Sequence, residues 1–452
     1  MLDGTFQWTG QTGDKLLDSV EMKVFLQALR RPVSVKTKAT IPDIDPVISV
    51  EDYKSIFNKT KEETASHPPL HYGHFKVAVE SDPLLQVNLL FMNLPFMFGI
   101  PLSRWLQSLH CMIQKDAEPK ITRLRIVQLY EADFNSVLKF VLGRKLMHHA
   151  DDHGINSPQL YGSRKNKSTH EALITLRVIY DMARLERCHM VSLFNDLKGC
   201  YDRIRPALNT ITTRRMGCPA EMAVCHARTV RLMKHRVRTA AGLSVDSITW
   251  SKEVDPGGVG QGNGAGPQSY HGQLLPQVLA YEQIANQGVA FVNPQGTKTF
   301  YQWLIGYVDD NSILLMVRDE TFAVNMMDKL LTEARRCVDI WQKLVVIAGG
   351  EIEVRKSCIA IMTWILKGGT EQMATSEEAP GTFQLQSLSN PDIKKELKRL
   401  DTNDGERILG VRLALSGSDK DEYIFRQQQA NELAATIASS PFTRLDAETI
   451  YR

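Results

Sequence analysis

The sequence lacks the features that mark secreted, disulfide-stabilised proteins. Its seven cysteines include no CxxC pair, so we expect reduced thiols and neither a disulfide framework nor a zinc site. Residues 1–13 are polar and contain glycine, unlike the apolar core of a secretory signal. These absences predict an intracellular protein, either cytoplasmic or nuclear.

Long apolar runs and charge of one sign are also scarce. The most apolar stretch, residues 84–102, is interrupted by Gln86, Asn88, Asn93 and Pro95, which indicates a buried helix followed by a turn and excludes a membrane partner. Lys and Arg number 54 against 51 Asp and Glu, a net charge of +3. This composition predicts a soluble globular protein with several domains.

Two adjacent aspartates, Asp309 and Asp310, stand between two apolar runs. Residues 300–306 and 313–317 are rich in aromatic and β-branched residues, which is typical of strands, and the polar residues between them favour a tight turn. Two like charges at the tip of a hairpin repel one another unless a cation neutralises them. The pattern indicates a divalent-metal site for phosphoryl transfer, with an exposed acidic turn as the alternative.

A third carboxylate follows another predicted strand. Residues 189–194 have the composition of a short strand, Asp196 lies just after it, and Tyr201 comes five residues later. Carboxylates at the ends of neighbouring strands can share two cations roughly 3.5–4 Å apart, the arrangement used for in-line nucleotidyl transfer. The third aspartate therefore favours a two-metal site over an exposed turn.

These motifs, in this order, resemble those of retrotransposon-type reverse transcriptases. Asp196-x4-Tyr201-Asp202 resembles the first palm motif of that family, and Tyr307-Val308-Asp309-Asp310 resembles the second, the YxDD hairpin. Four further segments resemble the fingers motif, the glycine-rich element before the hairpin, the glycine-then-lysine segment and the primer-grip strand pair, and they are residues 159–169, 258–267, 349–358 and 409–411.

The resemblance implies an α+β, right-hand polymerase with fingers, a ferredoxin-like palm sheet and a partial thumb. It implies RNA-directed DNA polymerase activity, in which dNTPs are joined to a primer 3′-hydroxyl on an RNA or DNA template. Two Mg²⁺ ions, or Mn²⁺ in their place, would be the cofactors. By resemblance, Asp196 and Asp309 would coordinate both ions, and Asp310 would be a supporting ligand.

The resemblance covers residues 120–412 and divides the chain into three parts. Residues 1–118 would form a helical N-terminal extension, 119–412 the fingers and palm, and 413–452 the start of a truncated thumb. Apolar spacing predicts helices at residues 16–30, 50–66, 133–149, 169–188, 322–349 and 422–439, the last one amphipathic, and residues 367–381 are expected to form a loop.

The nucleotide would contact several motifs. Residues 119–126 alternate cationic and apolar side chains, which predicts a strand with one charged face, and the resemblance makes it the fingers strand that grips phosphates. The glycine-rich segment would let a base pair pack on bare backbone, with a flexible loop as the alternative. The nucleotide-binding residues implied are Lys120, Arg123, Arg125, Tyr201, Gln261, Gly262 and Lys356.

Two of these residues have specific roles by resemblance. Tyr201 would lie under the incoming sugar and exclude a 2′-hydroxyl, whereas a core tyrosine at a strand–helix junction is the alternative. Lys356 is a candidate for protonating the leaving group, although a lysine after a strand turn is most often simply solvated.

Basic residues gather in the middle of the chain. Nine Lys or Arg occur between Arg203 and Arg238 against one acid, Glu221. Three of them repeat every three residues, which predicts a cationic stripe along a helix, either for a polyanion or as a solvated face. The nucleic-acid-binding residues predicted are Arg164, Lys165, Lys167, Arg228, Arg231, Lys234 and Gly410.

Two other functions remain as alternatives. A catalytically inactive, truncated element remnant would bind nucleic acid in a salt-sensitive way without magnesium-dependent incorporation. An RNA-dependent RNA polymerase would need a small or hydrogen-bonding group at the position of Tyr201, which argues against that class.

Overall fold

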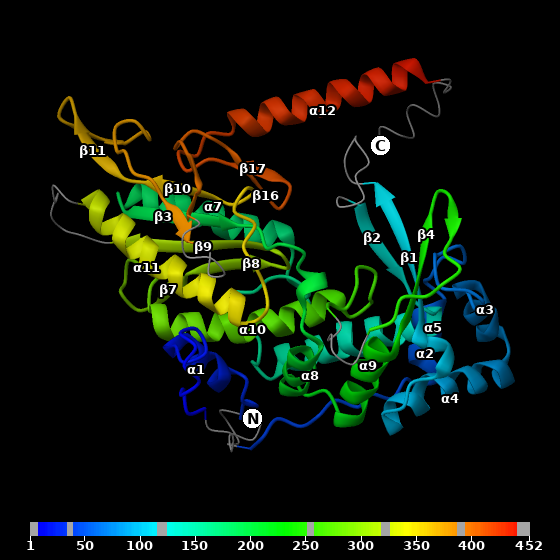
Figure 1. Ribbon diagram of the computed structural model, residues 1–452. Helices are drawn as coiled ribbons and strands as arrows, with labels where there is room; N and C mark the ends of the chain where they lie inside the picture. The colour runs from blue at the N-terminus through cyan, green and yellow to red at the C-terminus, as the bar shows by residue number, and fades with distance from the viewer. Residues whose placement is uncertain are drawn as a thin grey trace.

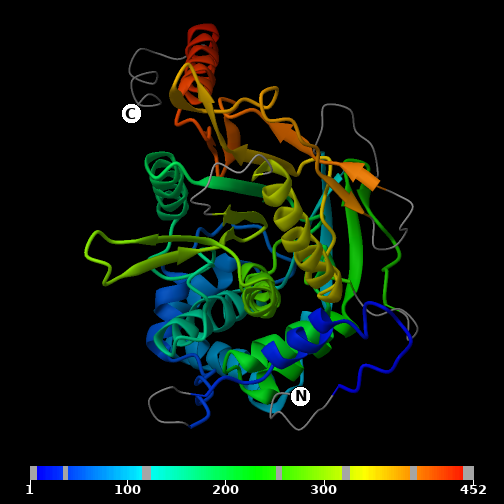
Figure 2. The ribbon, with the colours of Figure 1, turned by 90° about the vertical axis from the view of Figure 1, so that its left-hand side faces the viewer.

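The computed structural model describes residues 8–33, 39–114, 124–250, 257–317, 326–386 and 394–440. These residues form a mixed α+β fold, which contains a five-stranded sheet packed between helices, a four-stranded sheet and several two-stranded ribbons (Figures 1 and 2). The α+β prediction is confirmed at this level. Within the described ranges, no helix combines the length and apolar character needed to cross a lipid bilayer.

The five-stranded sheet has the strand order β15-β10-β3-β9-β8. β3 is antiparallel to both of its neighbours, so the strand that precedes Asp196 lies in the middle. The chain passes from β3 by way of α10 to β8 and β9, and then through α11 to β10. The strand bounds are β3 (His189–Asn195), β8 (Leu304–Tyr307), β9 (Asp310–Val317), β10 (Cys358–Met362) and β15 (Lys398–Leu400).

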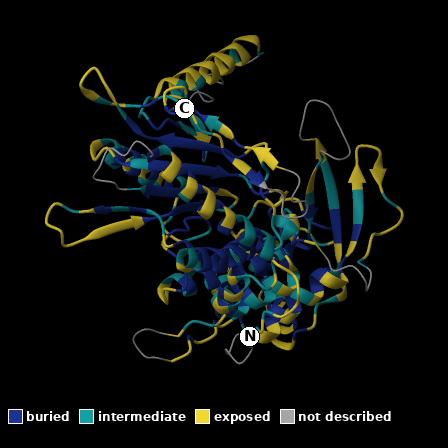
Figure 3. Cartoon of the chain, turned by 60° about the vertical axis from the view of Figure 1, so that its left-hand side comes forward, coloured by how far each residue is buried: buried dark blue, intermediate teal, exposed yellow. Residues whose placement is uncertain are grey.

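Helices cover this sheet on both faces. Successive residues of a strand point to opposite sides, so Val191 and Leu193 pack in the core that contains α10 (Gly266–Ala285) and α11 (Met326–Ile347). Met190 packs in a second core with α7 (Thr169–Leu185). The sheet is accordingly dark blue in Figure 3. Burial on both faces explains why β3 and β9 are mostly apolar and do not alternate between apolar and polar residues.

The predicted strand at 300–306 is two strands. β7 (Thr299–Gln302) pairs with β6 (Val289–Val292) in a separate ribbon, and β8 begins only at Leu304. The break falls at Trp303, because the backbone N–H groups of Trp303 and Leu304 both donate to Oε1 of Gln159, at 3.0 and 3.1 Å. The side chain of Gln159, which is distant in sequence, thus interrupts the strand.

Most predicted helices are confirmed with altered bounds. The 16–30 and 50–66 segments contain α1 (Val20–Ala28) and α2 (Val50–Phe57). The 133–149 segment is a continuous run of α5, the π-helical η4 and α6, and the side chain of Ser168 caps the start of α7. The remaining bounds are α3 (Tyr72–Val77), η1 (Ala78–Glu80), η2 (Ser103–Leu106), α5 (Ala132–Val137), η4 (Leu138–Leu146), α6 (Met147–Asp152), η5 (Tyr201–Arg203) and α8 (Pro206–Arg215).

The four-stranded sheet has the order β2-β1-β4-β5 and forms the right-hand side of Figure 1. Of the predicted strand 119–126, the structure describes the part from Leu124, where β2 begins, and Lys120 and Arg123 lie outside the described residues. The bounds are β1 (Gln107–Gln114), β2 (Leu124–Leu129), β4 (Lys234–Thr239) and β5 (Gly242–Leu243).

The predicted helical stripe of three cations is wrong at its last member. Arg228 and Arg231 lie on α9 (Ala220–Leu232), but Lys234 begins β4 and is paired in register with Gln107 of β1. Helical spacing in the sequence continues past Leu232, yet pairing with β1 ends the helix there.

Residues 84–102 form α4 (Asp82–Phe98), which ends at Gly99 with a φ of 68°. The predicted helix and turn are confirmed, but the prediction that the helix is buried holds for only one of its sides. Leu85, Leu89 and Met92 face the core, and the opposite side of the helix is exposed. α4 packs against α9 and α2 on one side only. The exposed apolar residues are Leu84, Val87, Leu90, Phe91, Leu94, Met97 and Phe98.

Two C-terminal predictions also need correction. Residues 367–381 are not all loop, because β11 (Trp364–Lys367) and β12 (Thr370–Met373) form a hairpin whose turn is Gly368-Gly369, both with positive φ. The helix predicted at 422–439 is α12 (Lys420–Ser439), but none of its residues is buried, so it has no core-facing side. It projects from the body at the top of Figure 1. The other strands here are β13 (Gln384–Gln386), β14 (Lys394–Glu396), β16 (Glu406–Ile408) and β17 (Val411–Leu413).

Candidate active site

The YxDD segment forms a two-residue hairpin turn. Tyr307 pairs with Asp310, so Val308 and Asp309 alone connect β8 to β9. Val308 has a φ of 57°, which is unusual for a β-branched residue and costs on the order of 1–3 kcal/mol. The predicted hairpin with carboxylates at its tip is therefore confirmed, and its turn is strained.

Tyr161 and Gly162 support this turn from one side. The N–H of Tyr161 donates to the carbonyl of Gly306 at 2.7 Å. A Cβ added at Gly162 would lie 2.6 Å from the backbone nitrogen of Val308. Since such a contact is far too short, Gly162 allows the two segments, distant in sequence, to pack backbone against backbone.

Strand register brings the third aspartate to the same end of the sheet. Asn195 is paired with Asn311, so Asp196, the next residue after β3, stands level with Asp310. The charges also influence one another: burial, and then the neighbouring Asp309 and Asp196, raise the pKa of Asp310 to about 6. Burial is the main cause that raises the pKa of Asp309, with a further contribution from Asp196.

Lys356 is the cation that lies closest to these carboxylates among the described residues. Its Nζ lies 2.9 Å from Oδ2 of Asp196, and this hydrogen bond raises the pKa of Lys356. The side chain is 62% exposed, so it is solvated as well as paired. One ammonium cannot balance three carboxylates, and the cluster is left with a negative excess.

Three carboxylates at one end of a sheet offer the oxygen ligands that hard cations bind. Mg²⁺ prefers carboxylate oxygens together with water and substrate phosphates, and Asp196, Asp309 and Asp310 supply such oxygens. In the described part of the chain, no His, Cys, Asp or Glu side chains form a ready-made group of three or more around a metal position.

Tyr201 lies beside this cluster on η5. Burial, and then Cys200 and Asp309, raise its pKa to about 12. A Cβ at Gly266 would sit 3.4 Å from the Tyr201 ring, and the ring of Tyr270 meets it edge-on with centroids 6.3 Å apart. Tyr201 is thus half-buried between the aspartates and the start of α10.

Cys200 and Tyr270 belong to this environment without having been predicted from the sequence. Burial, and then Asp309, raise the pKa of the Cys200 thiol to about 12. Cys200 could have been found from its place between Asp196 and Tyr201. Tyr270 had no such signal, because only the packing of α10 against η5 brings it close.

The glycine-rich segment is a shaped loop. The N–H of Val259 donates to the carbonyl of Tyr201 at 3.1 Å, and the N–H of Gln128 donates to the carbonyl of Gln261 at 2.6 Å. A Cβ at Gly262 would lie 2.3 Å from the Gln128 carbonyl oxygen. The glycines therefore allow close packing on η5 and β2, where a ligand was predicted to pack, and Gln261 and Gly262 are held against Gln128 of β2.

The predicted phosphate contacts are placed differently from one another. Arg125 is exposed on β2. The guanidinium of Arg164 is engaged within the protein, because it donates to Asp151 at 2.7 Å and to the carbonyls of Ser157 and Leu160 at 2.8 Å each. This shows a structural role for Arg164, and its binding role stays a prediction.

The remaining predicted residues are spread over the molecule. Lys165 is exposed, and Lys167 forms an ion pair with Glu171 and lies over the Tyr161 ring. Arg228 donates to the carbonyl of Gly99 at the end of α4, at 2.9 Å, while Arg231 and Lys234 are exposed. Gly410, with a φ of 93°, makes the turn between β16 and β17. The predicted short strand pair at 409–411 is thus confirmed as a hairpin.

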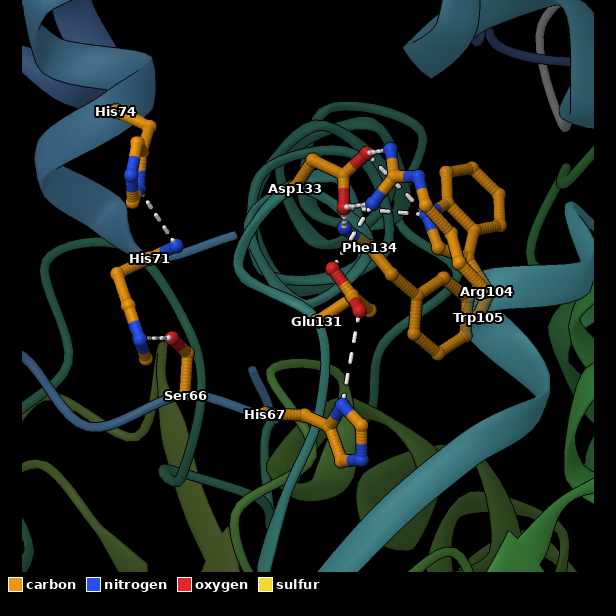
Figure 4. A network of polar contacts seen from close by, with 9 residues as sticks. All are labelled: Ser66, His67, His71, His74, Arg104, Trp105, Glu131, Asp133 and Phe134. Atoms are coloured by element: carbon orange, nitrogen blue, oxygen red, sulfur yellow. Dashed lines mark hydrogen bonds and ion pairs between the residues drawn. The ribbon is translucent and has the colours of Figure 1, made fainter. Parts of the chain in front are cut away.

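Another carboxylate pair is neutralised inside the fold. Arg104 donates to Glu131 at 3.0 Å and to Asp133 at 2.9 Å, and Nε1 of Trp105 donates to Asp133 at 3.1 Å. His67 approaches the second Glu131 oxygen at 3.6 Å. Figure 4 shows these side chains converging, with the nearby histidines bonded to Ser66 and to each other. This cluster is structural, because its side chains pair with one another inside the fold.

Comparison with known proteins finds neither a protein-family model nor a curated protein that the chain matches.

Proposed function

We propose that the chain is an RNA-directed DNA polymerase of the retrotransposon type. The observation that carries the proposal is the register of β3 and β9, which sets Asp196 level with Asp310 at the end of a sheet. A strand–helix–strand–strand–helix–strand path with the order β10-β3-β9-β8 further supports a ferredoxin-like palm.

In this proposal the three aspartates are the metal ligands. Asp196 and Asp309 would hold two Mg²⁺ ions, with Asp310 in support. When bound, the ions would lower the pKa of the primer 3′-hydroxyl and neutralise the charge of the triphosphate. The residues of the chain position the substrates: Tyr201 excludes a 2′-hydroxyl by its bulk, and Lys356 offers a proton to the leaving pyrophosphate.

The test is incorporation of labelled dTTP by the purified chain on poly-rA primed with oligo-dT, in the presence of Mg²⁺. The wild type should extend the primer, and Asp309→Asn should reduce the rate by more than about a thousandfold, as expected for a group that acts at the reacting atoms. Asp246→Asn, in an exposed position, is the matched control and should retain full activity. A folded wild-type chain that extends no primer would reject the proposal.

A nucleic-acid-binding protein without polymerase activity is the second candidate. It is favoured by the ion pair between Lys356 and Asp196, since the ammonium neutralises one of the carboxylates that a metal would need. The same assay separates the two candidates, because this protein would bind the primed template and incorporate nothing.

The choice of sugar is tested by comparing dNTPs with rNTPs. If Tyr201 excludes ribose by its bulk, Tyr201→Ala should increase the use of rNTPs relative to dNTPs, with little change for dNTPs themselves. Equal exclusion of rNTPs by wild type and variant would leave Tyr201 as a packing residue.

A further inference from the structure

A second charged region lies on the N-terminal helices. A hollow of about 370 Å³ opens between α2, the segment that follows it, α3 and the α5–η4 helix. We call it the cationic pocket. Four cations line it, and they are Lys59, Lys61, Lys139 and Arg144.

The cationic pocket contains no acid among its lining residues. Of the acids nearby along the chain, Glu62 pairs with Lys76 at 3.3 Å, Asp52 pairs with Lys145 at 3.0 Å, and Glu63 lines a different hollow. Within the described residues, none of the four cations forms an ion pair of its own. Four like charges around one hollow repel each other and attract an anion.

Neutral donors complete the lining. Hydroxyl groups bind phosphate oxygens well in nucleic-acid complexes, and two of those here, on Tyr72 and Ser136, belong to buried side chains. Arg144, whose guanidinium lies 5.5 Å from the centre of the Phe140 ring, can bind phosphate through two parallel hydrogen bonds. The other hydroxyls are those of Ser55, Thr64 and Thr60, and the hydroxyl of Thr60 already donates to the carbonyl of Ile56 at 2.8 Å.

One helix joins the pocket to the candidate active site. Asn135 on α5 donates to the carbonyl of Gly262 at 3.1 Å and accepts from the N–H of Gly264 at 2.6 Å. Lys139, one turn further on, lines the pocket and also lies against Gly264, where an added Cβ would come within 2.8 Å of its Cβ. The glycine-rich loop and the pocket thus both contact Lys139.

We propose that the cationic pocket binds backbone phosphates of a single-stranded RNA segment outside the catalytic centre. The proposal rests on the proposed function, because a template base held at the glycine-rich loop would continue over Lys139 into the pocket. Lysine ammonium groups contact phosphates as point charges, so the site would accept any base sequence.

The test is binding of a fluorescent oligo-rA of about 20 nucleotides, measured by anisotropy in EDTA over a series of KCl concentrations. Each phosphate contact on a single strand adds about 0.7 to the slope of log K against log salt. The variant Lys59→Gln/Lys61→Gln/Lys139→Gln/Arg144→Gln should therefore lower the slope by up to about 2.8 and weaken binding at low salt by more than about tenfold.

A matched control removes the same charge elsewhere. Lys15→Gln/Lys23→Gln/Arg30→Gln/Lys298→Gln replaces three lysines and one arginine at exposed positions and should leave the slope unchanged. Lys59→Gln/Lys61→Gln alone, at two exposed positions, should give about half of the full effect and guards against misfolding of the quadruple variant. Thermal unfolding of each protein checks that it is folded.

The outcomes separate this proposal from polymerase activity. RNA binding that depends on the pocket, in a chain that extends no primer, supports the pocket and rejects the polymerase. Primer extension by a quadruple variant whose salt slope equals that of the wild type overturns the pocket. Pocket-dependent binding of tripolyphosphate or of vesicles rich in anionic lipid, with RNA binding unchanged, overturns it as well and points to a different phosphate source.

Discussion

The central sheet and the N-terminal helices differ in how completely the fold covers them. β3 and β9 are buried on both faces between α7 and the α10–α11 pair, whereas α4 is covered on one side only. The charges differ in the same way. The aspartates are placed by strand register at the end of a rigid sheet, and the cations of the pocket stand on exposed or half-exposed side chains.

This difference indicates two modes of binding. A rigid set of carboxylates suits ligands that must be held at fixed distances, such as metal ions in catalysis. Lysines on flexible side chains suit a polyanion, which is attracted by their charge and needs no fixed contact distances. The Arg104 cluster shows a third case, in which two carboxylates pair with a guanidinium inside the protein.

The largest expected difference concerns burial itself. Leu193→Ala in β3, a residue 1% exposed, should lower the free energy of unfolding by about 2–5 kcal/mol, because it leaves a cavity in a packed core. Leu90→Ala on the exposed side of α4, a residue 53% exposed, should cost less than about 0.5 kcal/mol. Urea unfolding of the two variants measures the contrast, and equal costs would show that the outer side of α4 is covered in solution.

The contact that supports the strained turn should come next. Gly162→Ala places a Cβ 2.6 Å from the nitrogen of Val308 and should cost about 1–3 kcal/mol of stability by overpacking. Gly73→Ala in α3, where the nearest atom is 3.7 Å away, is the control and should be neutral or stabilising, since alanine favours helices. If Gly162→Ala unfolds at the same temperature as the wild type, residue 162 does not pack closely against the hairpin turn.

The acidic cluster predicts a pH dependence. Because the folded-state pKa of Asp310, about 6, is raised above its ordinary value of 3.8, ionisation of Asp310 is less favourable in the folded chain. No penalty exists below pH 3.8, and stability is lost as the pH rises toward 6. Relative to wild type, Asp310→Asn should therefore gain thermal stability at pH 7 and not at pH 3.5, in EDTA.

The control for this experiment is Asp246→Asn, which should show the same difference from the wild type at both pH values. A gain for Asp310→Asn that does not change with pH would mean that neither burial nor the neighbouring carboxylates raise the pKa of Asp310.

The smallest effect concerns the ammonium beside Asp196. Lys356→Gln removes a cation that lies 2.9 Å from that carboxylate, so it should tighten Mn²⁺ binding by up to about fivefold, the range expected for a solvated ion pair. Incorporation should fall in the same variant if Lys356 protonates the leaving group. Isothermal titration with Mn²⁺ measures the first effect, and Lys298→Gln, at an exposed position on the β6–β7 hairpin, is the control. Weaker binding by Lys356→Gln would show that the lysine orders the site.

Strong local patterns made several elements predictable. The β3 strand, the YxDD hairpin and α11 each combine a regular pattern of apolar residues with a polar or glycine boundary, and the structure has all three. The grouping of Asp196 with the hairpin was predicted from its place after a strand and from the resemblance, but the strand register that joins them could not be predicted, because the residues between them carry no signal for strand pairing.

Other features depended on partners that are distant in sequence. β8 begins at Leu304 because the N–H groups of Trp303 and Leu304 donate to the side chain of Gln159. Lys234 lies outside the helix because it pairs with Gln107 of β1. The glycines of the loop face Gln128 and Tyr201, which local spacing could not reveal.

The sequence by itself determined where apolar strands and helices form and where carboxylates, glycines and cations stand along the chain, since these follow from side-chain chemistry and short-range periodicity. Only the tertiary structure decided which of these residues meet. Strand register placed Asp196 level with Asp310, and packing of α5 against the glycine-rich loop joined that loop to the cationic pocket. The physical reason is that contacts between distant segments depend on pairing and packing over the whole fold, which no local pattern encodes.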